Sequence, residues 1–255
     1  MKLLVLGSGT STGVPRIGNE WGECDPGEPK NRRSRVSILV ESDEGARLLV
    51  DTSTDLRQQL LDNGIDKVDA VFWTHDHADH CHGIDDLRPM RFHRNAPLPG
   101  FASETTARSL RQRFSYVFSG RYGYPTIVEL QTLEHVKIHA GFAIASVEMP
   151  HGPTASTGFR FEADGKSIAY ATDFSEISDE MAALFSGVDI LVTDCLRREP
   201  HPTHASLAMA LDFHARCSPG TTVLTHLDMT MDYATLSAEM PPGVVVGYDG
   251  MELAA

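Results

Sequence analysis

Short apolar runs alternate with segments of helical periodicity along the whole chain, and no repeat or low-complexity linker interrupts them. Runs rich in β-branched and aromatic residues, bounded by Gly, Pro and Asp, predict strands. These runs cover residues 2–6, 36–40, 47–50, 68–73, 157–161, 167–171, 188–193, 222–224 and 244–246, with two more strands within 136–149. Apolar residues at helical spacing predict helices over residues 55–63, 83–94 with a break at Pro89, 104–114, 178–185, 206–216 and 232–240.

The order of these elements predicts the fold class. Strands outnumber helices in the first half, and turn signals at 43–45 and 163–165 predict hairpins that mix with crossover units. This order is typical of an α/β (α+β) protein in which two mixed sheets pack face to face with helices outside, a four-layer αβ/βα sandwich. No composition change marks a boundary, so we expect a single domain over residues 1–255.

The segment 71–82, VFWTHDHADHCH, carries the strongest chemical signal in the chain. An apolar run ends at Thr74, and His75, His77, Asp79 and His80 follow within six positions. A lone histidine is more often a surface or hydrogen-bonded residue than a ligand. Four ligand-type side chains directly after a buried strand reverse that expectation, because imidazole and carboxylate together suit Zn, Mn, Fe or Co. The segment therefore predicts a metal site.

Composition and charge narrow the classes of partner. Apolar residues make up 41% of 255 residues, enough for a substantial core, and the formal net charge is −13. Nucleic-acid binders usually carry a basic face, so this charge makes a nucleic-acid partner unlikely and argues against a broad phosphate-tracking surface. A local basic patch is still open, with Arg32, Arg33 and Arg35 as its candidates.

The cysteines and the N-terminus predict the compartment. The four cysteines lie far apart and form no CxxC pair, as is typical of reduced thiols rather than a disulfide framework. The apolar run before Gly7 is too short for a signal-peptide core, and no run is long enough to span a membrane. We therefore expect a soluble, cytoplasmic protein with no membrane partner.

The segment HDHADH resembles the HxHxDH signature of the metallo-β-lactamase superfamily. Further landmarks of that superfamily follow its order along essentially the whole chain: Asp51 in LLVDTS, His151 in EMPHG, Asp173 in YATDF and His226 in VLTHLD. Within the superfamily the chain is most similar to the phosphodiesterase branch typified by PhnP. That closer resemblance is carried by GSGTSTGVP (7–15), PKNRRSR (29–35), PHPTHASL (200–207) and GYDG (247–250).

The resemblance implies a site with two divalent metal ions, Mn²⁺ or Zn²⁺. His75, His77 and His151 would hold one ion, Asp79, His80 and His226 the other, and Asp173 would bridge them. Such a pair lowers the pKa of water and neutralises charge on a phosphoryl group. Asp79 and His204 would be catalytic: His204 matches the general acid of the phosphodiesterase branch, and neighbouring His201 is its rival.

Two more expectations come from the resemblance. Asp51 would orient the histidine segment, since ligand imidazoles need an outer partner. Relatives often have clustered cysteines and a further histidine that build a structural zinc site. Here only Cys24 is present and Met229 stands at the histidine position, so we predict no structural zinc and a plain buried thiol at Cys24.

The chain is thus expected to be a dinuclear-metal phosphodiesterase acting on a small cyclic phosphate or nucleotide-like phosphodiester. A carboxyl-ester or thioester hydrolase of the same fold is one alternative, and a tRNA 3′-processing endoribonuclease is another. Against the nuclease, only 22 positions separate His151 from Asp173, too few for a basic arm. A non-enzymatic metal or nucleotide sensor would have lost ligands, and no loss is visible. Relatives are often dimers, so a homodimer is compatible with the resemblance.

Two motifs can each be interpreted in two ways, as a phosphate-binding element or as a structural one. The turn Gly7-Ser8-Gly9-Thr10 could cradle a phosphate with its backbone N–H groups, or its glycines could permit tight packing. The basic segment 29–35 could clamp a phosphate or form surface ion pairs. The exposed arginines of 104–114, namely Arg108, Arg111 and Arg113, favour a solvated helix face over a substrate contact.

Overall fold

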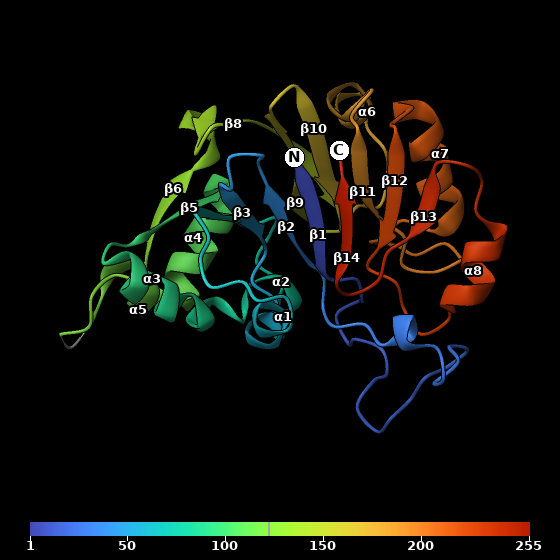
Figure 1. Ribbon diagram of the computed structural model, residues 1–255, viewed down its shortest axis with the longest axis horizontal. Helices are drawn as coiled ribbons and strands as arrows, with labels where there is room; N and C mark the ends of the chain where they lie inside the picture. Colours follow the sequence, from blue (N-terminus) through green and yellow to red (C-terminus); the bar gives the residue numbers. More distant parts are fainter. Residues whose placement is uncertain (122) are drawn as a thin grey trace.

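The computed structural model describes residues 1–121 and 123–255, and it contains two seven-stranded sheets (Figure 1). In spatial order, the first sheet consists of β14 (Met251–Ala254), β1 (Lys2–Gly7), β2 (Ser37–Glu41), β3 (Arg47–Val50), β4 (Ala70–Phe72), β5 (Leu98–Ala102) and β6 (Val128–Thr132). The second consists of β13 (Val244–Val246), β12 (Thr221–Thr225), β11 (Ile190–Asp194), β10 (Lys166–Ala171), β9 (Thr154–Ala163), β8 (Phe142–His151) and β7 (Ile138–His139).

Helices cover the outer face of each sheet (Figure 1). The first sheet is accompanied by α1 (Leu56–Asp62), α2 (Ala78–Cys81), α3 (Arg88–Arg94), α4 (Glu104–Arg113) and α5 (Ser115–Ser119). The second is covered by α6 (Asp179–Phe185), α7 (Leu207–Cys217) and α8 (Tyr233–Glu239). Short 3₁₀ turns lie at Pro29–Asn31, Ile84–Leu87 and Leu133–His135. The predicted four-layer sandwich is therefore confirmed, while its being a single domain stays a prediction.

An apolar core between the two sheets fixes their relative position. Phe72 of β4 packs against Phe159 and Phe161 of β9, with ring centroids 5.6 and 5.3 Å apart, and against Phe101 of β5 at 5.0 Å. Aromatic pairs at this spacing contribute beyond the apolar area that they bury. Because Phe72 lies three positions before His75, this packing also positions the start of the histidine segment.

Strand direction brings the polar strand ends of both sheets to one edge. In the first sheet β3, β4 and β5 are parallel, and in the second β10, β11 and β12 are parallel. β8 has the same direction as β10 because each is antiparallel to β9. The carboxyl ends of β4, β8, β10, β11 and β12 therefore lie at the same edge of the sandwich, where ligands commonly bind in α/β folds.

Most predicted elements are confirmed within a few residues, and the differences have local causes. Three strands were not predicted: β5, which contains Pro99 and Gly100, and the short edge strands β6 and β14. The expected helix over 83–94 is a 3₁₀ turn followed by α3. Pro89 lies in the first turn of α3 rather than breaking it, because a missing N–H costs nothing at that position.

The turn at residues 7–10 is a packing device, and its interpretation as a phosphate cradle is wrong. Its backbone N–H groups already donate within the protein: Ser8 to Asp249, Gly9 to the Ser34 carbonyl and Thr10 to the Leu227 carbonyl. Asp249 also accepts hydrogen bonds from the Ser8 hydroxyl and from the backbone and hydroxyl of Ser34. Three segments that carry the PhnP resemblance thus meet at one carboxylate.

Arg33 is likewise internal, so its interpretation as a surface phosphate ligand is wrong. The side chain is 2% exposed and donates to the carbonyls of Asp228 and Met231 at 3.2 and 2.6 Å. Its guanidinium also lies 3.8 Å from the buried Cys24 sulfur. Arg35 pairs with Asp55 at 3.0 Å, which leaves Arg32 as the exposed member of the trio. Arg33 therefore ties the loop over residues 17–31 to segment 228–231.

Replacement of Gly7 by Ala is expected to destabilise the fold. A Cβ at Gly7 would lie 2.1 Å from the backbone oxygen of Arg35, a main-chain atom that no side-chain rotation can move away. We expect a loss of about 1–3 kcal/mol in the free energy of unfolding, measured by urea denaturation. Gly27→Ala is the control, because its nearest neighbour is a flexible carboxylate 3.2 Å away. Equal stability of the two variants would contradict the packing role.

Candidate metal centre

The first sheet delivers four of the predicted ligands through one short turn and helix. β4 ends at Phe72, and the backbone of Trp73 and Thr74 leads directly to His75. His77 precedes α2, whose first turn contains Asp79 and His80. His75, Asp79 and His80 are buried, whereas His77 is exposed. The helix thus turns two of the four side chains away from solvent and toward the second sheet.

The second sheet supplies the other predicted ligands from separate strands. His151 is the last residue of β8, Asp173 follows β10 and His226 follows β12. Asp173 and His226 have φ of 60° and 61°, and Asp51 in the first sheet has φ of 64°. This left-handed backbone is strained for residues other than glycine and clusters at functional sites. Here it turns the chain sharply where each strand ends.

Asp173 lies at the centre of the cluster. Its Oδ1 is 3.3 Å from His80 Nε2 and 3.6 Å from His226 Nε2. Its Oδ2 is 3.5 Å from His151 Nε2 and 3.7 Å from His75 Nε2. Each carboxylate oxygen thus faces a different set of imidazoles, one set on each side. This placement suits the bridging position that the sequence predicts.

Two adjoining groups of side chains could each hold a cation. The ligand atoms of His75, His77, His151 and Asp173 lie within 4.8 Å of one another, as do those of Asp79, His80 and His226. The buried Nε2 atoms of His80 and His226 have no hydrogen-bond partner in the described part of the chain. Orphaned buried nitrogens beside carboxylates are costly unless a cation fills the gap. The residues therefore fit divalent metal ions, and their assignment as ligands stays a prediction.

Electrostatics within the cluster favour charged carboxylates. Burial alone would raise the pKa of Asp79, but His80 and His226 hold that pKa well below its usual range. Burial opposes the charged form of His226, yet Asp173, Asp79 and Asp194 raise the pKa of this imidazole to about 9. The protons on His80 and His226, whose pKa values are raised, thus neutralise the carboxylates, whereas burial lowers the pKa values of His75 and His151. A bound cation would take over this task and release those protons.

Asp51 anchors the histidine segment from behind. Its Oδ2 lies 2.7 Å from His80 Nδ1, and its Oδ1 accepts a hydrogen bond of 2.8 Å from the Thr74 backbone. The Thr74 hydroxyl also donates to Asp51 at 2.9 Å and lies 3.0 Å from His75 Nδ1. Asp51 is fully buried. The predicted orienting role of Asp51 agrees with this geometry, because the outer nitrogen of His80 is fixed and Nε2 must face the cluster.

His204 joins the cluster, whereas His201 lies farther out. His204 Nδ1 is 3.1 Å from Asp194 Oδ2 and 3.7 Å from Asp173 Oδ2. Its ring stacks on His226 with centroids 4.7 Å apart. The His201 ring lies 5.2 Å from that of His204, and its Nδ1 is beside Thr203. The structure thus brings His204, rather than its rival, against the predicted bridging carboxylate.

Two residues near the centre were missed by the sequence reasoning. Asp194 ends β11 in LVTDC, the same strand-end pattern as Asp51 and Asp173, and that pattern could have revealed it. Arg113 of α4 was expected on a solvated face. It is indeed exposed, and it also donates to the backbone oxygen and carboxylate of Asp76, which lies between the ligand candidates His75 and His77. No local sequence signal links Arg113 to Asp76, which is 37 positions away.

Comparisons with known proteins agree with this geometry. The Beta-lactamase superfamily domain matches residues 46–227. An octanoyltransferase from Porphyromonas gingivalis is 36% identical over 99% of this chain, which spans only about half (51%) of that protein. A crystal structure described as a new diphosphatase from the PhnP family has a TM-score of 0.89 and 38% identity, over 99% of this chain and 96% of that chain.

A further solved structure has a similar fold. The Zn²⁺-bound PqqB of Methylobacterium extorquens has a TM-score of 0.79 at 21% identity, with 100% coverage of both chains. The chain therefore belongs to the β-lactamase superfamily, and within it to the PhnP-like metal-dependent hydrolases. Among the described residues, no helix combines the length and the hydropathy that crossing a bilayer requires.

Asp51→Asn is expected to weaken metal binding by about 10–100-fold, because an amide cannot hold His80 as the carboxylate does. Asn also tolerates the left-handed backbone at this position. Affinity would be measured by titration against a chelator of known strength. Asp62→Asn, an exposed change on α1, is the control. Wild-type affinity in the Asp51 variant, with the fold intact by circular dichroism, would exclude the anchoring role.

Proposed function

We propose that the protein is a dinuclear-metal phosphodiesterase that acts on a small phosphodiester, such as a cyclic phosphate or a nucleotide-like diester. The observation that carries the proposal is the placement of Asp173 between two adjoining ligand groups. Mn²⁺ or Zn²⁺ would be held by His75, His77 and His151 on one side and by Asp79, His80 and His226 on the other, with Asp173 between them. The relative described as a PhnP-family diphosphatase supports phosphorus–oxygen bond cleavage.

Two bound divalent ions would lower the pKa of water toward neutrality and neutralise charge on a phosphoryl group. The protein's own contribution is to fix these groups before the substrate arrives. Asp51 and Thr74 hold the histidine segment, and the Arg113 guanidinium holds the backbone between His75 and His77. Rigid placement of reacting groups accounts for a large part of catalysis in such sites.

His204 would protonate the leaving alkoxide. Asp194 engages its Nδ1 at 3.1 Å, which leaves Nε2 as the nitrogen that can donate to substrate. The stacked His226 ring limits how His204 can turn. Asp194 thereby serves as a positioning residue, because it orients the imidazole without touching substrate.

One comparison favours a second candidate function, hydrolysis of a thioester or carboxyl ester. The relative that carries the name octanoyltransferase is similar over almost the whole of this chain. Its name describes transfer of an acyl group, and metallo-hydrolase chemistry can also attack an acyl carbon. The name covers a protein of which this chain spans about half, so the acyl chemistry can reside in the other half.

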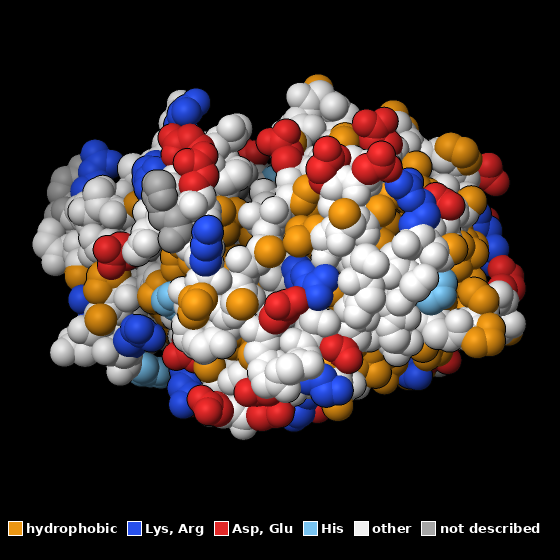
Figure 2. All heavy atoms as spheres, turned by 90° about the horizontal axis from the view of Figure 1, so that it is seen from above, with side chains coloured by type: hydrophobic (Ala, Val, Ile, Leu, Met, Phe, Trp, Pro, Cys, Tyr) orange, Lys and Arg blue, Asp and Glu red, His pale blue; other side chains and the backbone are white. Residues whose placement is uncertain are grey.

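A tRNA-processing nuclease has less support. The segment between His151 and Asp173 is filled by β9 and β10, so no arm is inserted there. Figure 2 shows acidic and basic side chains interspersed over the face that carries the chain termini. The net charge of −13 makes a small substrate a better match to the protein than a nucleic acid.

Location and assembly are further proposals. All four cysteines are buried and unpaired, which supports a reducing, cytoplasmic setting that cell fractionation would test. A homodimer stays a prediction, and light scattering of the purified protein would test it.

Hydrolysis of bis(p-nitrophenyl) phosphate by the purified protein tests the proposal. After loading with Mn²⁺ or Zn²⁺ we expect turnover that a chelator abolishes and that Asp79→Ala and Asp173→Ala lack. An octanoyl thioester is assayed in parallel. Thioester turnover without phosphodiester turnover, with both metal positions shown to be filled, would establish the second function instead.

His204→Ala is expected to lower the rate about 10²–10⁴-fold on an alkyl diester, whose alkoxide must be protonated as it leaves. The loss should be much smaller with p-nitrophenolate as the leaving group, because that anion departs without a proton. His201→Ala is the matched control, and metal content should be unchanged in both variants. Full activity of His204→Ala on the alkyl diester would exclude it as the general acid and make His201 the next candidate.

A further inference from the structure

His77 differs from the ligand candidates around it because no protein group holds its ring from behind. Its Nδ1 faces the cluster, 2.9 Å from His75 Nε2 and 3.3 Å from His151 Nε2. Its Nε2 has no hydrogen-bond partner among the residues that the structure describes, and the residue is exposed. A ligand imidazole is usually oriented through its outer nitrogen. The position of His77 must therefore come from its backbone.

The two imidazoles that share a ligand group with His77 do have such partners. His75 Nδ1 lies 3.0 Å from the Thr74 hydroxyl, and His151 Nδ1 lies 2.7 Å from the Thr203 carbonyl oxygen. Both rings are buried, so neither can turn away from the cluster without losing its partner. Within this ligand group His77 is therefore the member whose placement depends most on the chain around it.

The backbone before His77 is fixed by contacts to Asp76, most of which come from α4. The Arg113 guanidinium donates to the Asp76 backbone oxygen and, at 3.1 Å, to its carboxylate. The Ser109 hydroxyl donates to the same carboxylate, and Cys81 Sγ lies 3.3 Å from the Asp76 backbone oxygen. Ser109 and Arg113 are four positions apart and thus lie on one face of the helix. This face holds the residue directly before His77.

Arg113 also contacts the far end of the ligand segment. Its second terminal nitrogen lies beside Nε2 of His82, which follows the last residue of α2. The His82 ring packs edge-on against Phe114, with ring centroids 5.6 Å apart. One planar guanidinium thus spans Asp76 and His82, the residues on either side of segment 77–81. A lysine ammonium could not replace this fork, because it is a compact point charge.

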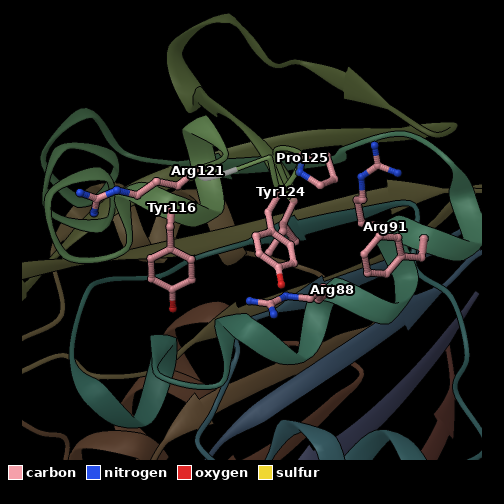
Figure 3. Close-up of a pocket in the computed structure, with 8 residues that line it drawn as sticks. Arg88, Arg91, Tyr116, Arg121, Tyr124 and Pro125 are labelled. Atoms are coloured by element: carbon pink, nitrogen blue, oxygen red, sulfur yellow. The ribbon is translucent and has the colours of Figure 1, made fainter.

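Other arginines of the same helical layer have different partners. Arg88 pairs with Asp85 at 3.0 Å, and Arg91 donates to the Thr126 carbonyl at 3.3 Å. Together with Tyr124 they line a pocket of about 400 Å³ (Figure 3). The hydrogen bonds of Arg113, by contrast, are made with the histidine segment. Contact with the metal centre is therefore a particular property of Arg113 and not a general one of this layer.

We propose that Arg113 is a positioning residue for His77 and, through it, for the ion of the ligand group that contains His77. The inference rests on the metal assignment of the proposed function, and it does not depend on which bond the enzyme cleaves. The other ligand group has its own support, because Asp51 holds His80 at 2.7 Å. Loss of Arg113 should therefore weaken one ion and spare the other.

Competition for Co²⁺ between the full-length protein and a chelator of known strength tests the proposal. The wild type should bind two ions per chain, and Arg113→Ala should bind one of them about 10–100-fold more weakly. Arg113→Lys should recover only part of this loss, because an ammonium cannot span both acceptors. Arg108→Ala is the matched control, since Arg108 is an exposed arginine of the same helix that pairs with Glu104. Circular dichroism of the metal-free proteins would verify that all variants are folded.

Two ligand variants distinguish positioning from a general loss of structure. In His77→Ala, the ion that remains should not weaken further when Arg113→Ala is added, because the residue that Arg113 positions is already gone. In His226→Ala, the remaining ion should weaken as much as it does in the wild-type background. Ser109→Ala removes the other contact of α4 with Asp76, so we expect a smaller weakening of the same ion.

The results that would overturn the proposal are equal weakening of both ions in Arg113→Ala, wild-type affinity in that variant, or a further loss in the His77→Ala background. Selective weakening of one ion, in a protein that hydrolyses no phosphodiester with both ions bound, would uphold the role of Arg113 and refute the proposed function. A wild type that binds a single ion would overturn both.

Discussion

The buried carboxylate of Asp173 is the constraint on which the rest of the site depends. It has a 2% exposed side chain and lies within 3.7 Å of imidazoles that arrive from both sheets. A buried charge of this kind must be compensated by partners, because moving a charge out of water costs much free energy. The surrounding histidines provide that compensation through protons or through a shared cation. The same residue therefore couples charge balance, metal affinity and the chemistry of the site.

The two sheets must pack correctly before that compensation exists. Phe72 packs on Phe159 and Phe161 across the sandwich, and the Thr157 backbone donates to the Thr74 carbonyl at 2.9 Å. These contacts lie within a few residues of His75, so the packing of the apolar core also positions the polar edge. A shift of one sheet against the other would break both ligand groups apart, because each group combines residues from the two sheets. The geometry of the site therefore depends on the packing of the core.

The sequence was most informative where chemistry is concentrated in a short segment. The histidine segment and most elements were predictable, because hydrophobic periodicity and ligand spacing are local signals. The strand-end carboxylates Asp51 and Asp173 were predictable only through the resemblance to a known family. Asp194 shares the strand-end pattern and was predictable in principle. Arg113, buried Arg33 and the edge strand β14 were not, since each is defined by partners far along the chain. The same holds for Gly7 and Gly9: the sequence predicted the turn, but it did not predict the distant residues that pack against it.

Pairing of β1 with β14 places the two chain ends side by side, with Lys2 opposite Ala254. β1 begins at the edge of the sheet opposite the strand ends that carry the metal centre, and Figure 1 shows both termini together at that edge. A polypeptide extending from either end would leave the fold on the side away from the active rim. The architecture is thus compatible with covalent fusion, because an attached domain would join the fold at the edge away from the metal centre.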